Sequence, residues 1–312
     1  MTWQFTLTGL GLGLVVGLTG VGGGSLMTPI LIIVFGFKPS YAVGTDIFHG
    51  AVFKSFGAIR HRRLSTVHGH LALWLFAGSG PLAIAGVVVS YMLRNSIANA
   101  ETILGYAIGV ALIGGGAGFL AKSFVKRGIQ PSDAPFIMSR RDKLIALGTG
   151  ALFGFIVGIT SVGSGTYFGL MMVLVYPLTM PRIVGTDIFH AAALLWVAGA
   201  GHLIIGDVDL HATAWLLLGS VPGILISSRY TVKVPDMTIR CGLGGILIIS
   251  GIKLLNTPGA NWILGGGLIT LLIVLTIYTV RVMVSESRAT AESRATAESR
   301  ATAEHAEPVH LR

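Results

Sequence analysis

The chain has 312 residues, of which 53% are hydrophobic and 11% are charged, whereas an ordinary soluble domain carries about 25% charged residues. This composition excludes a soluble globular protein. The formal net charge of +9 does not indicate a nucleic-acid partner, because the basic residues separate apolar runs and do not gather on a polar face.

The chain opens on a long run without a charge, Met1–Phe37. A cleaved signal would need a basic start, and Met1–Leu14 has no Lys or Arg, so we expect this run to be kept as structure. At about 1.5 Å per residue the run is too long for one span of about 20 residues and slightly short for two. It predicts a re-entrant or V-shaped pair of half-helices with its tip at Gly20–Gly24.

Seven later segments predict full crossings of the bilayer. They are Pro39–Ile59, Leu71–Leu93, Thr102–Ala121, Arg182–Gly206, His211–Ser228, Thr238–Leu255 and Trp262–Val280. Between the third and fourth of them lies a second uncharged run of similar length, Leu144–Pro181, which predicts a second broken pair with its tip at Gly163–Gly165. The expected fold is therefore an all-α polytopic membrane protein, with the lipid bilayer as its surroundings.

The two halves of the chain align without a gap when one constant is added to every residue number of the first half, so that Val43 aligns with Val184. Val43–His49 recurs as Val184–His190 with seven identities in seven, and Val16–Gly24 recurs in the same way as Val157–Gly165. This predicts one membrane domain over 1–285, made of two structural repeats at about 5–122 and 144–255, a cytoplasmic linker at 123–143 and an extra span at 262–280.

The basic residues predict the orientation of the two repeats. Thirteen fall on one side of the expected topology: Arg60, Arg62, Arg63, the six Lys and Arg of Lys122–Lys143, Arg182, Arg229, Lys233 and Arg240. Only Lys38, Arg94 and Lys253 fall on the other. By the positive-inside rule the first side is cytoplasmic, so the loop after Ile59 lies inside, its equivalent Gly206–Asp209 lies outside, and the repeats are inverted.

The end of the chain differs in kind from the rest. Residues 286–303 repeat the hexad Glu-Ser-Arg-Ala-Thr-Ala, which is too polar to form a core, so 286–312 is predicted as a low-complexity cytoplasmic tail. The single cysteine, Cys241, excludes an internal disulfide and is interpreted as a small packed residue.

The glycine tips are candidate substrate contacts. No GxxxxGK[ST] is present, which argues against a nucleotide loop. A half-helix that starts after such a tip points free N–H groups and a positive dipole end into a cavity, which suits an anion. The candidate substrate-binding residues are Thr19, Gly22, Gly23, Gly24, Ser25, Thr160, Gly163, Ser164, Gly165 and Thr166. The alternative is that the tips are tight turns only.

The glycines spaced by four, Gly9/Gly13/Gly17 and Gly150/Gly154/Gly158, indicate close helix packing.

Two Asp–His pairs are candidate coupling or gating groups. Asp46 and His49, like Asp187 and His190, are spaced i, i+3, so each pair shares a helix face, and an ionisable residue inside a membrane is a functional hypothesis by default. We include Thr45 and Thr186, which precede the aspartates. The alternative is that each Asp bonds its own Thr or His and only pins the broken helix.

Lys54 breaks the symmetry of the repeats, because its equivalent is Leu195. It could pair with Asp46, attract an anion or extend to the cytoplasmic rim. No cofactor is predicted, and no His pair has metal-ligand spacing with matching carboxylates, so no metal site is predicted.

These motifs resemble the sulfite exporter TauE/SafE family, also called the toluene-sulfonate uptake permease family. The resemblance covers Gly9–Leu255 and is carried by the glycine turn Val16–Gly24 followed by Pro29, by Ala42–Thr45 and His61–Arg63, and by their second-half counterparts Val184–His190, Gly199–His202 and Gly219–Pro222. It implies a non-enzymatic permease of the plasma membrane, the inner membrane in bacteria, for small sulfur-containing anions such as sulfite or organosulfonates, coupled to protons. A homodimer is compatible with it. Members with serine at Asp46 and Asp187 differ from this chain, so the substrate does not carry over.

Three other functions stay open from the sequence. Asp46 and Asp187 could form the dyad of an intramembrane aspartyl protease, although Gly-Thr-Asp replaces the Gly-x-Gly-Asp expected of that class. A passive channel is the second. A transporter of metal cations is the third, and it would need more than two intramembrane carboxylates.

Overall fold

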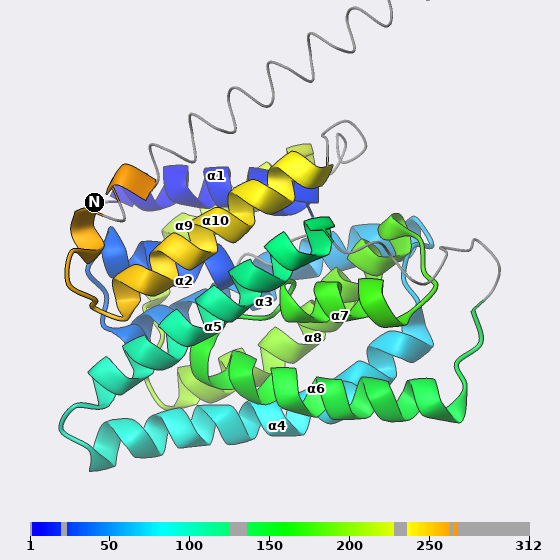
Figure 1. The fold of residues 1–312 in the computed structure, drawn as a ribbon, viewed down its shortest axis with the longest axis horizontal. Helices are drawn as coiled ribbons and strands as arrows, with labels where there is room; N and C mark the ends of the chain where they lie inside the picture. The colour runs from blue at the N-terminus through cyan, green and yellow to red at the C-terminus, as the bar shows by residue number, and fades with distance from the viewer. Residues whose placement is uncertain (1, 20–23, 125–135, 228–235, 263–264, 268–312) are drawn as a thin grey trace, which may run out of the picture.

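The computed structural model describes residues 2–19, 24–124, 136–227, 236–262 and 265–267. Every regular element within these residues is α-helical, which confirms the all-α part of the predicted fold class (Figure 1). Most of the predicted extra span 262–280, and all of the predicted tail 286–312, lie outside the described residues.

The helix bounds agree closely with the predicted spans. The helices are α1 (Thr2–Thr19), α2 (Gly24–Ile33), α3 (Pro39–Arg63), α4 (Gly69–Ser96), α5 (Ala100–Phe124), α6 (Arg140–Thr160), α7 (Tyr167–Val175), α8 (Met180–Ile204), α9 (Leu210–Ser227) and α10 (Asp236–Leu254). Proline opens α3 and stands at the second position of α8, where its missing N–H leaves no hydrogen bond unmade.

Each of the two long uncharged runs is broken into two helices, as predicted. Residues 20–23 separate α1 from α2 and lie outside the described residues. Residues 161–166 separate α6 from α7, and there the backbone leaves the helical region at Ser161 (φ 60°), Gly163 (φ 124°) and Gly165 (φ 115°). Such positive φ values are open to glycine and strained for most other residues, so the glycines at this tip are required by the backbone.

The two arms of the second break are unequal, whereas the sequence predicted a pair of half-helices. Helix α6 has 21 residues and α7 only nine, because α6 continues from the linker. It runs parallel to α4, with Gly150 facing Leu75 and Gly158 facing Ala83. Gly158 also lies beside Gly86, and α4 extends ten residues further, or about 15 Å. The tip therefore lies well short of the end of the bundle.

Helices α3 and α8 form the centre of the molecule (Figure 1). Helix α9 packs against both α3 and α1. In the same way, α4 packs against both α8 and α6. The short helices α2 and α7 pack against α3 and α8, and α5 lies against α10. These contacts occur in equivalent pairs in the two halves, and α5 packs in addition on α3, α4 and α6.

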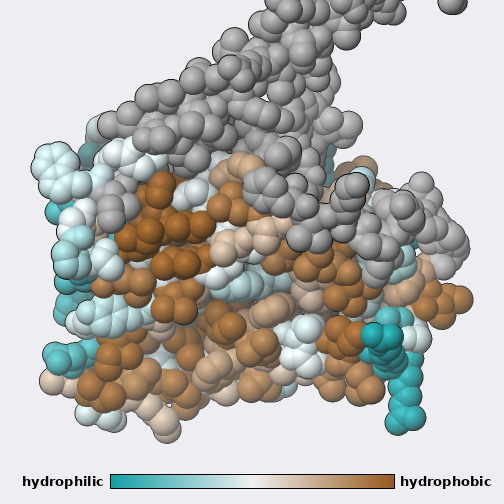
Figure 2. Space-filling model, viewed as in Figure 1, coloured by the Kyte–Doolittle hydropathy of each residue, from teal (hydrophilic) through white to brown (hydrophobic). Residues whose placement is uncertain are grey.

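Apolar side chains cover the outside of the helices as well as the interior. Figure 2 shows a hydrophobic surface over the described helices, with hydrophilic residues gathered toward their ends. Large side chains such as Leu73, Val110 and Leu218 are more than half exposed, which in water would be an aggregation hazard but in lipid is expected. Five described helices are long and apolar enough to cross a membrane: α4, α5 over Ala100–Ala121, α6, α8 and α9.

Candidate functional site

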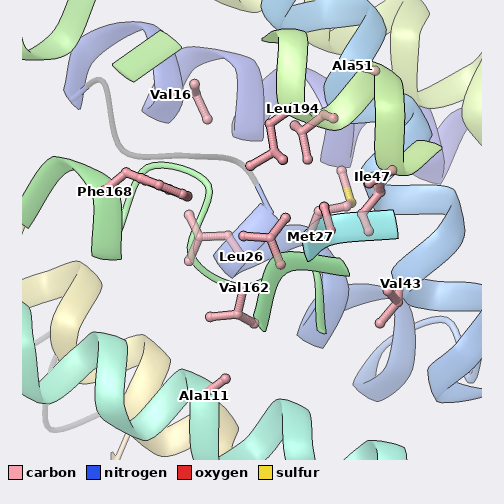
Figure 3. Packing of buried hydrophobic residues seen from close by; sticks show 14 of the residues in the cluster. Val16, Leu26, Met27, Val43, Ile47, Ala51, Ala111, Val162, Phe168 and Leu194 are labelled. Atoms are coloured by element: carbon pink, nitrogen blue, oxygen red, sulfur yellow. The ribbon is translucent and has the colours of Figure 1, made fainter. Parts of the chain in front are cut away.

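The centre of the site is built on α3 and α8, where the repeated motif places Asp46 and His49 on one helix and Asp187 and His190 on the other. All four side chains are buried. Buried apolar residues surround the breaks beside them, among them Leu26 and Met27 of α2, Val162 of the tip and Phe168 of α7 (Figure 3). The ring of Phe168 lies 4.4 Å from that of His190.

Each histidine is held by a serine from the opposite half. His49 Nε2 lies 2.8 Å from Ser220 Oγ on α9, and His190 Nε2 lies 2.9 Å from Ser79 Oγ on α4. The two bonds are equivalent under the shift that relates the repeats, with the halves exchanged. Because a buried polar group without a partner is costly, each bond fixes one core helix against a neighbour from the other repeat.

Asp46 is bonded to both broken pairs. Thr28 of α2 donates a hydrogen bond of 2.5 Å to its Oδ2, and Ser161 of the second tip donates one of 2.8 Å to the same oxygen. These partners are not its own Thr45 or His49, so the alternative interpretation, in which Asp46 bonds within α3, is wrong for this residue. Its carboxylate instead connects α2, which belongs to the first broken pair, to the tip of the second broken pair.

The threonines before the aspartates hold loops. Thr45 Oγ1 accepts a hydrogen bond of 2.9 Å from the Asp209 backbone N–H, and Thr186 Oγ1 accepts one of 2.8 Å from the His68 backbone N–H. These contacts are again related by the repeat shift, with the halves exchanged. The loop after α8 is therefore anchored on α3, next to Asp46, and the loop after α3 is anchored on α8, next to Asp187.

The two half-helices meet at their N-termini. Ser25 Oγ of α2 lies 3.3 Å from Thr166 Oγ1, the N-cap of α7, and these two residues are themselves equivalent under the shift. Both side chains are buried. The positive dipole ends of two helices thus converge on one point inside the molecule, an arrangement that favours an anion.

Lys54 lies at the tip of the second broken pair, where it contacts Ser164, two residues before the N-cap of α7. Its side chain is only 1% exposed, and its Nζ donates to the Ser164 backbone oxygen at 3.0 Å and to Ser164 Oγ at 3.1 Å. The ammonium is close enough to Asp187 and Asp46 to interact with both carboxylates electrostatically. The interpretation that Lys54 extends to the cytoplasmic rim is therefore wrong, and its charge lies at the tip of the second broken pair.

The other predicted substrate contacts divide into two groups. Thr160 bonds its own helix, donating to the Ile156 backbone oxygen at 2.7 Å and accepting from the Val162 N–H at 3.2 Å, so it shapes the tip. Gly163 and Gly165 supply the turn described above. Gly22 and Gly23, and the side chain of Thr19, lie outside what the structure describes, as does the surrounding of Gly24.

Ser161 of the tip is not among the predicted site residues, and three polar residues outside the tips were not predicted either: Thr28, Ser79 and Ser220. The two serines carried a usable signal, because they are polar residues that recur in both halves inside apolar spans. Thr28 carried none, since its counterpart is Gly169.

Comparisons with known proteins give a consistent result. A family model described as sulfite exporter TauE/SafE matches residues 5–254. The chain is 36% identical over 255 residues to the probable membrane transporter protein YjnA of Bacillus subtilis (strain 168), which covers 82% of this chain and 100% of that protein. It is 23% identical over 245 residues to the probable membrane transporter protein YdhB of the same organism, which covers 78% and 96%. No solved structure matches significantly.

Proposed function

Because the chain belongs to the TauE/SafE sulfite exporter family and is a membrane transporter, we propose that it moves a small sulfur-containing anion, such as sulfite or an organosulfonate, by proton-coupled alternating access. The observation that carries this proposal is the burial of Lys54 against Ser164, two residues before the N-cap of α7, whose N-terminus meets that of α2. An ammonium and two helix dipoles attract the same kind of ligand.

The charges around Lys54 give a physical reason for proton coupling. One ammonium beside two ionised carboxylates leaves the cluster with a net charge of −1, which repels an anion. Protonation of Asp46 and Asp187 changes the net charge to +1. A proton on each aspartate therefore favours anion binding, and release of the protons favours anion release, so the two movements are linked.

The inversion that we propose for the two repeats favours alternating access. Contacts between the halves occur in exchanged pairs, such as His49 with Ser220 and His190 with Ser79. Two packings of similar energy then follow from one sequence pattern, as many secondary transporters use. We place the basic loops, the linker 123–143 and the tail 286–312 in the cytoplasm, and the protein in the plasma membrane.

The test is the flux of labelled sulfite in proteoliposomes with and without an inward proton gradient. The wild type is compared with Asp46→Asn and Asp187→Asn, and with Asp142→Asn as the control, since that carboxylate caps the start of α6 away from the site. We expect gradient-dependent flux to fall at least about tenfold in one or both site variants, the effect of about 1.4 kcal/mol, and to persist in the control.

Three outcomes would contradict parts of the proposal. Equal flux in all variants would show that the aspartates only hold the helices together. Flux that ignores the gradient would remove proton coupling but leave a sulfite transporter. An absence of flux for sulfite, thiosulfate and sulfonates under every gradient would refute the substrate class.

A further inference from the structure

The two ends of the core are closed by equivalent loops. Loop 205–209, after α8, anchors on Thr45, and loop 64–68, after α3, anchors on Thr186. Glycine makes both approaches close: a methyl group on Gly44 would overlap the Asp207 backbone oxygen, and one on Gly185 would overlap Thr66. The backbone closure is therefore the same at the two ends.

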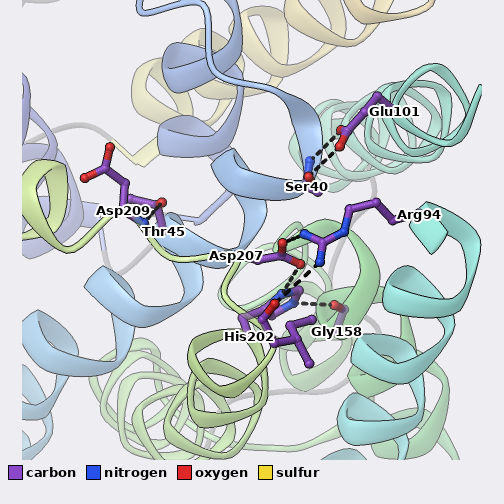
Figure 4. A network of polar contacts seen from close by, with 9 residues as sticks. Ser40, Thr45, Arg94, Glu101, Gly158, His202, Asp207 and Asp209 are labelled. Carbon is purple, nitrogen blue, oxygen red and sulfur yellow. Dashed lines mark hydrogen bonds and ion pairs between the residues drawn. The ribbon is translucent and has the colours of Figure 1, made fainter.

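The side chains that close the ends are different. At the α8 end, the Asp207 carboxylate is 1% exposed, forms an ion pair with Arg94 of α4, and lies 3.7 Å from Nδ1 of the fully buried His202 (Figure 4). At the other end the counterparts are Thr66 and His61, which share a bond of 3.0 Å. Both are only partly buried.

A second charged contact closes the same end as Arg94. Glu101 of α5 accepts hydrogen bonds from the Ser40 backbone N–H at 3.0 Å and from Ser40 Oγ at 2.6 Å (Figure 4). The carboxylate lies at the N-terminus of α3, where a negative charge is favoured. The counterparts of Ser40, Glu101 and Arg94 are Pro181, Gly242 and Pro235, which cannot make either contact.

The cluster of Arg94, Asp207 and His202 reaches Asp46 by two routes. The first is its own loop, whose Asp209 N–H is bonded to Thr45, the neighbour of Asp46. In the second, His202 Nε2 lies 3.0 Å from the Gly158 backbone oxygen of α6, three residues before Ser161, which donates to Asp46. Movement of the cluster therefore changes two supports of the Asp46 carboxylate.

We propose that Arg94, Asp207 and His202 form a latch that holds closed the end of the core opposite the basic loops and keeps Asp46 in its bonded geometry. Among the described residues, the other end has His61 and Thr66 in place of these charged side chains; it therefore opens more readily, so the transporter rests open toward the basic side. By the positive-inside rule that side is the cytoplasm. The inference rests on the alternating access proposed above and assigns these three residues as positioning residues.

The test measures which end is open by cysteine labelling, which requires no substrate. In a Cys241→Ser background, single cysteines replace Ile47, which packs on Gly199, or its counterpart Ile188, which packs on Gly57. Both isoleucines are buried, one in the half of the core near each end. A membrane-impermeant maleimide is applied to either side of oriented proteoliposomes, and the labelling rate is recorded.

The latch variants are Asp207→Asn and Arg94→Gln. Arg94 is 23% exposed, so its charge reaches water when the pair is broken, and if one variant is not recovered folded, the other carries the test. We expect labelling at position 47 to rise about fivefold or more, the lower end of typical couplings between sites, while labelling at 188 does not rise. Asp209→Asn removes a charge from the same loop, keeps the cap of α9, and is expected to label like wild type.

Two results would overturn the latch. If both positions label faster, the substitutions loosen the protein at both ends and have no directional role. If position 47 labels at the wild-type rate in the folded variants, or rises equally in Asp209→Asn, the ion pair does not hold that end. A failure of sulfite flux alone leaves this result standing, because labelling reports the conformation and not the substrate.

Discussion

At the scale of single residues, the unequal pair Lys54 and Leu195 matters most. The two halves keep the same Asp, His, Thr and Ser at equivalent positions, and only one of them places an ammonium among these groups. Burying a lone charge is unfavourable unless it is paired and hydrogen-bonded, and Lys54 has both Ser164 contacts and nearby carboxylates. A buried charge of this kind is weak evidence for a stabilising role, and we propose that Lys54 serves to bind the anion.

The variant Lys54→Leu copies the residue that the other half uses. We expect sulfite flux to fall at least about tenfold, because a charge-assisted hydrogen bond to the anion contributes about 1.5–3 kcal/mol. The apparent melting temperature in detergent is expected to fall, because removing one partner of a buried group of charges leaves the Asp46 and Asp187 carboxylates uncompensated, which typically costs about 3–5 kcal/mol.

Lys38→Leu is the matched control for this charge. Lys38 is exposed just before the same helix, α3, so its loss is expected to leave flux unchanged. Wild-type flux in Lys54→Leu would show that the ammonium serves the structure of the tip and does not bind the anion.

At the scale of helices, close packing through glycine joins the halves. A methyl group on Gly9 or Gly13 of α1 would overlap backbone oxygens of α9, and one on Gly150, Gly154 or Gly158 would overlap those of α4. The predicted packing role of these glycines is thereby confirmed, and Gly17 lies outside the described contacts. Small residues allow such approaches in membranes, where no hydrophobic effect drives helices together.

Gly154→Ala is expected to destabilise this packing. The added methyl would overlap Ser79, whose side chain holds His190, and over-packing of this kind costs about 1–3 kcal/mol or more. The apparent melting temperature should fall by a few degrees, since the shift is about 2–4 °C per kcal/mol for domains of about 150–250 residues and smaller for a longer chain. Gly148→Ala in the same helix has open space around it and is expected to be neutral or stabilising. Equal melting temperatures for the two variants would contradict the packing interpretation.

At the scale of the whole molecule, residues of one half contact their own counterparts in the other half. Ser25 contacts its own counterpart Thr166, and the Trp196 indole N–H donates to its counterpart Ser55 at 2.9 Å. A residue can touch its own counterpart only near an axis that relates the two copies. We propose that this axis lies in the membrane plane, which makes the repeats inverted.

Single cysteines at Leu64 and Ile204, again with Cys241 replaced by serine, test the inversion. Both side chains are more than half exposed, at the ends of α3 and α8, and they lie at nearly equivalent positions in the halves. Inverted repeats predict that an impermeant maleimide labels Leu64→Cys from the cytoplasmic side and Ile204→Cys from the opposite side. Labelling of both from one side would refute the inversion.

The sequence alone determined the helical class, the repeat and the helix bounds. It could do so because these features depend on local composition: apolar runs of about 20 residues must form helices in lipid, and glycine clusters interrupt them. It also found Asp46, His49, Lys54 and the tips as candidates, because a polar residue in an apolar span is conspicuous. The motifs shared with the family indicated the same segments as candidates.

Only the tertiary structure decided which of these groups meet. Thr28 and Ser161 reach Asp46 from two different halves, and Ser164 receives Lys54 from 110 residues away, pairings that no local pattern encodes. The long first arm α6, and the charged closure of one end by Arg94 and Asp207, likewise depend on which helices pack together. Packing in the folded chain, and not the order of residues, sets these distances.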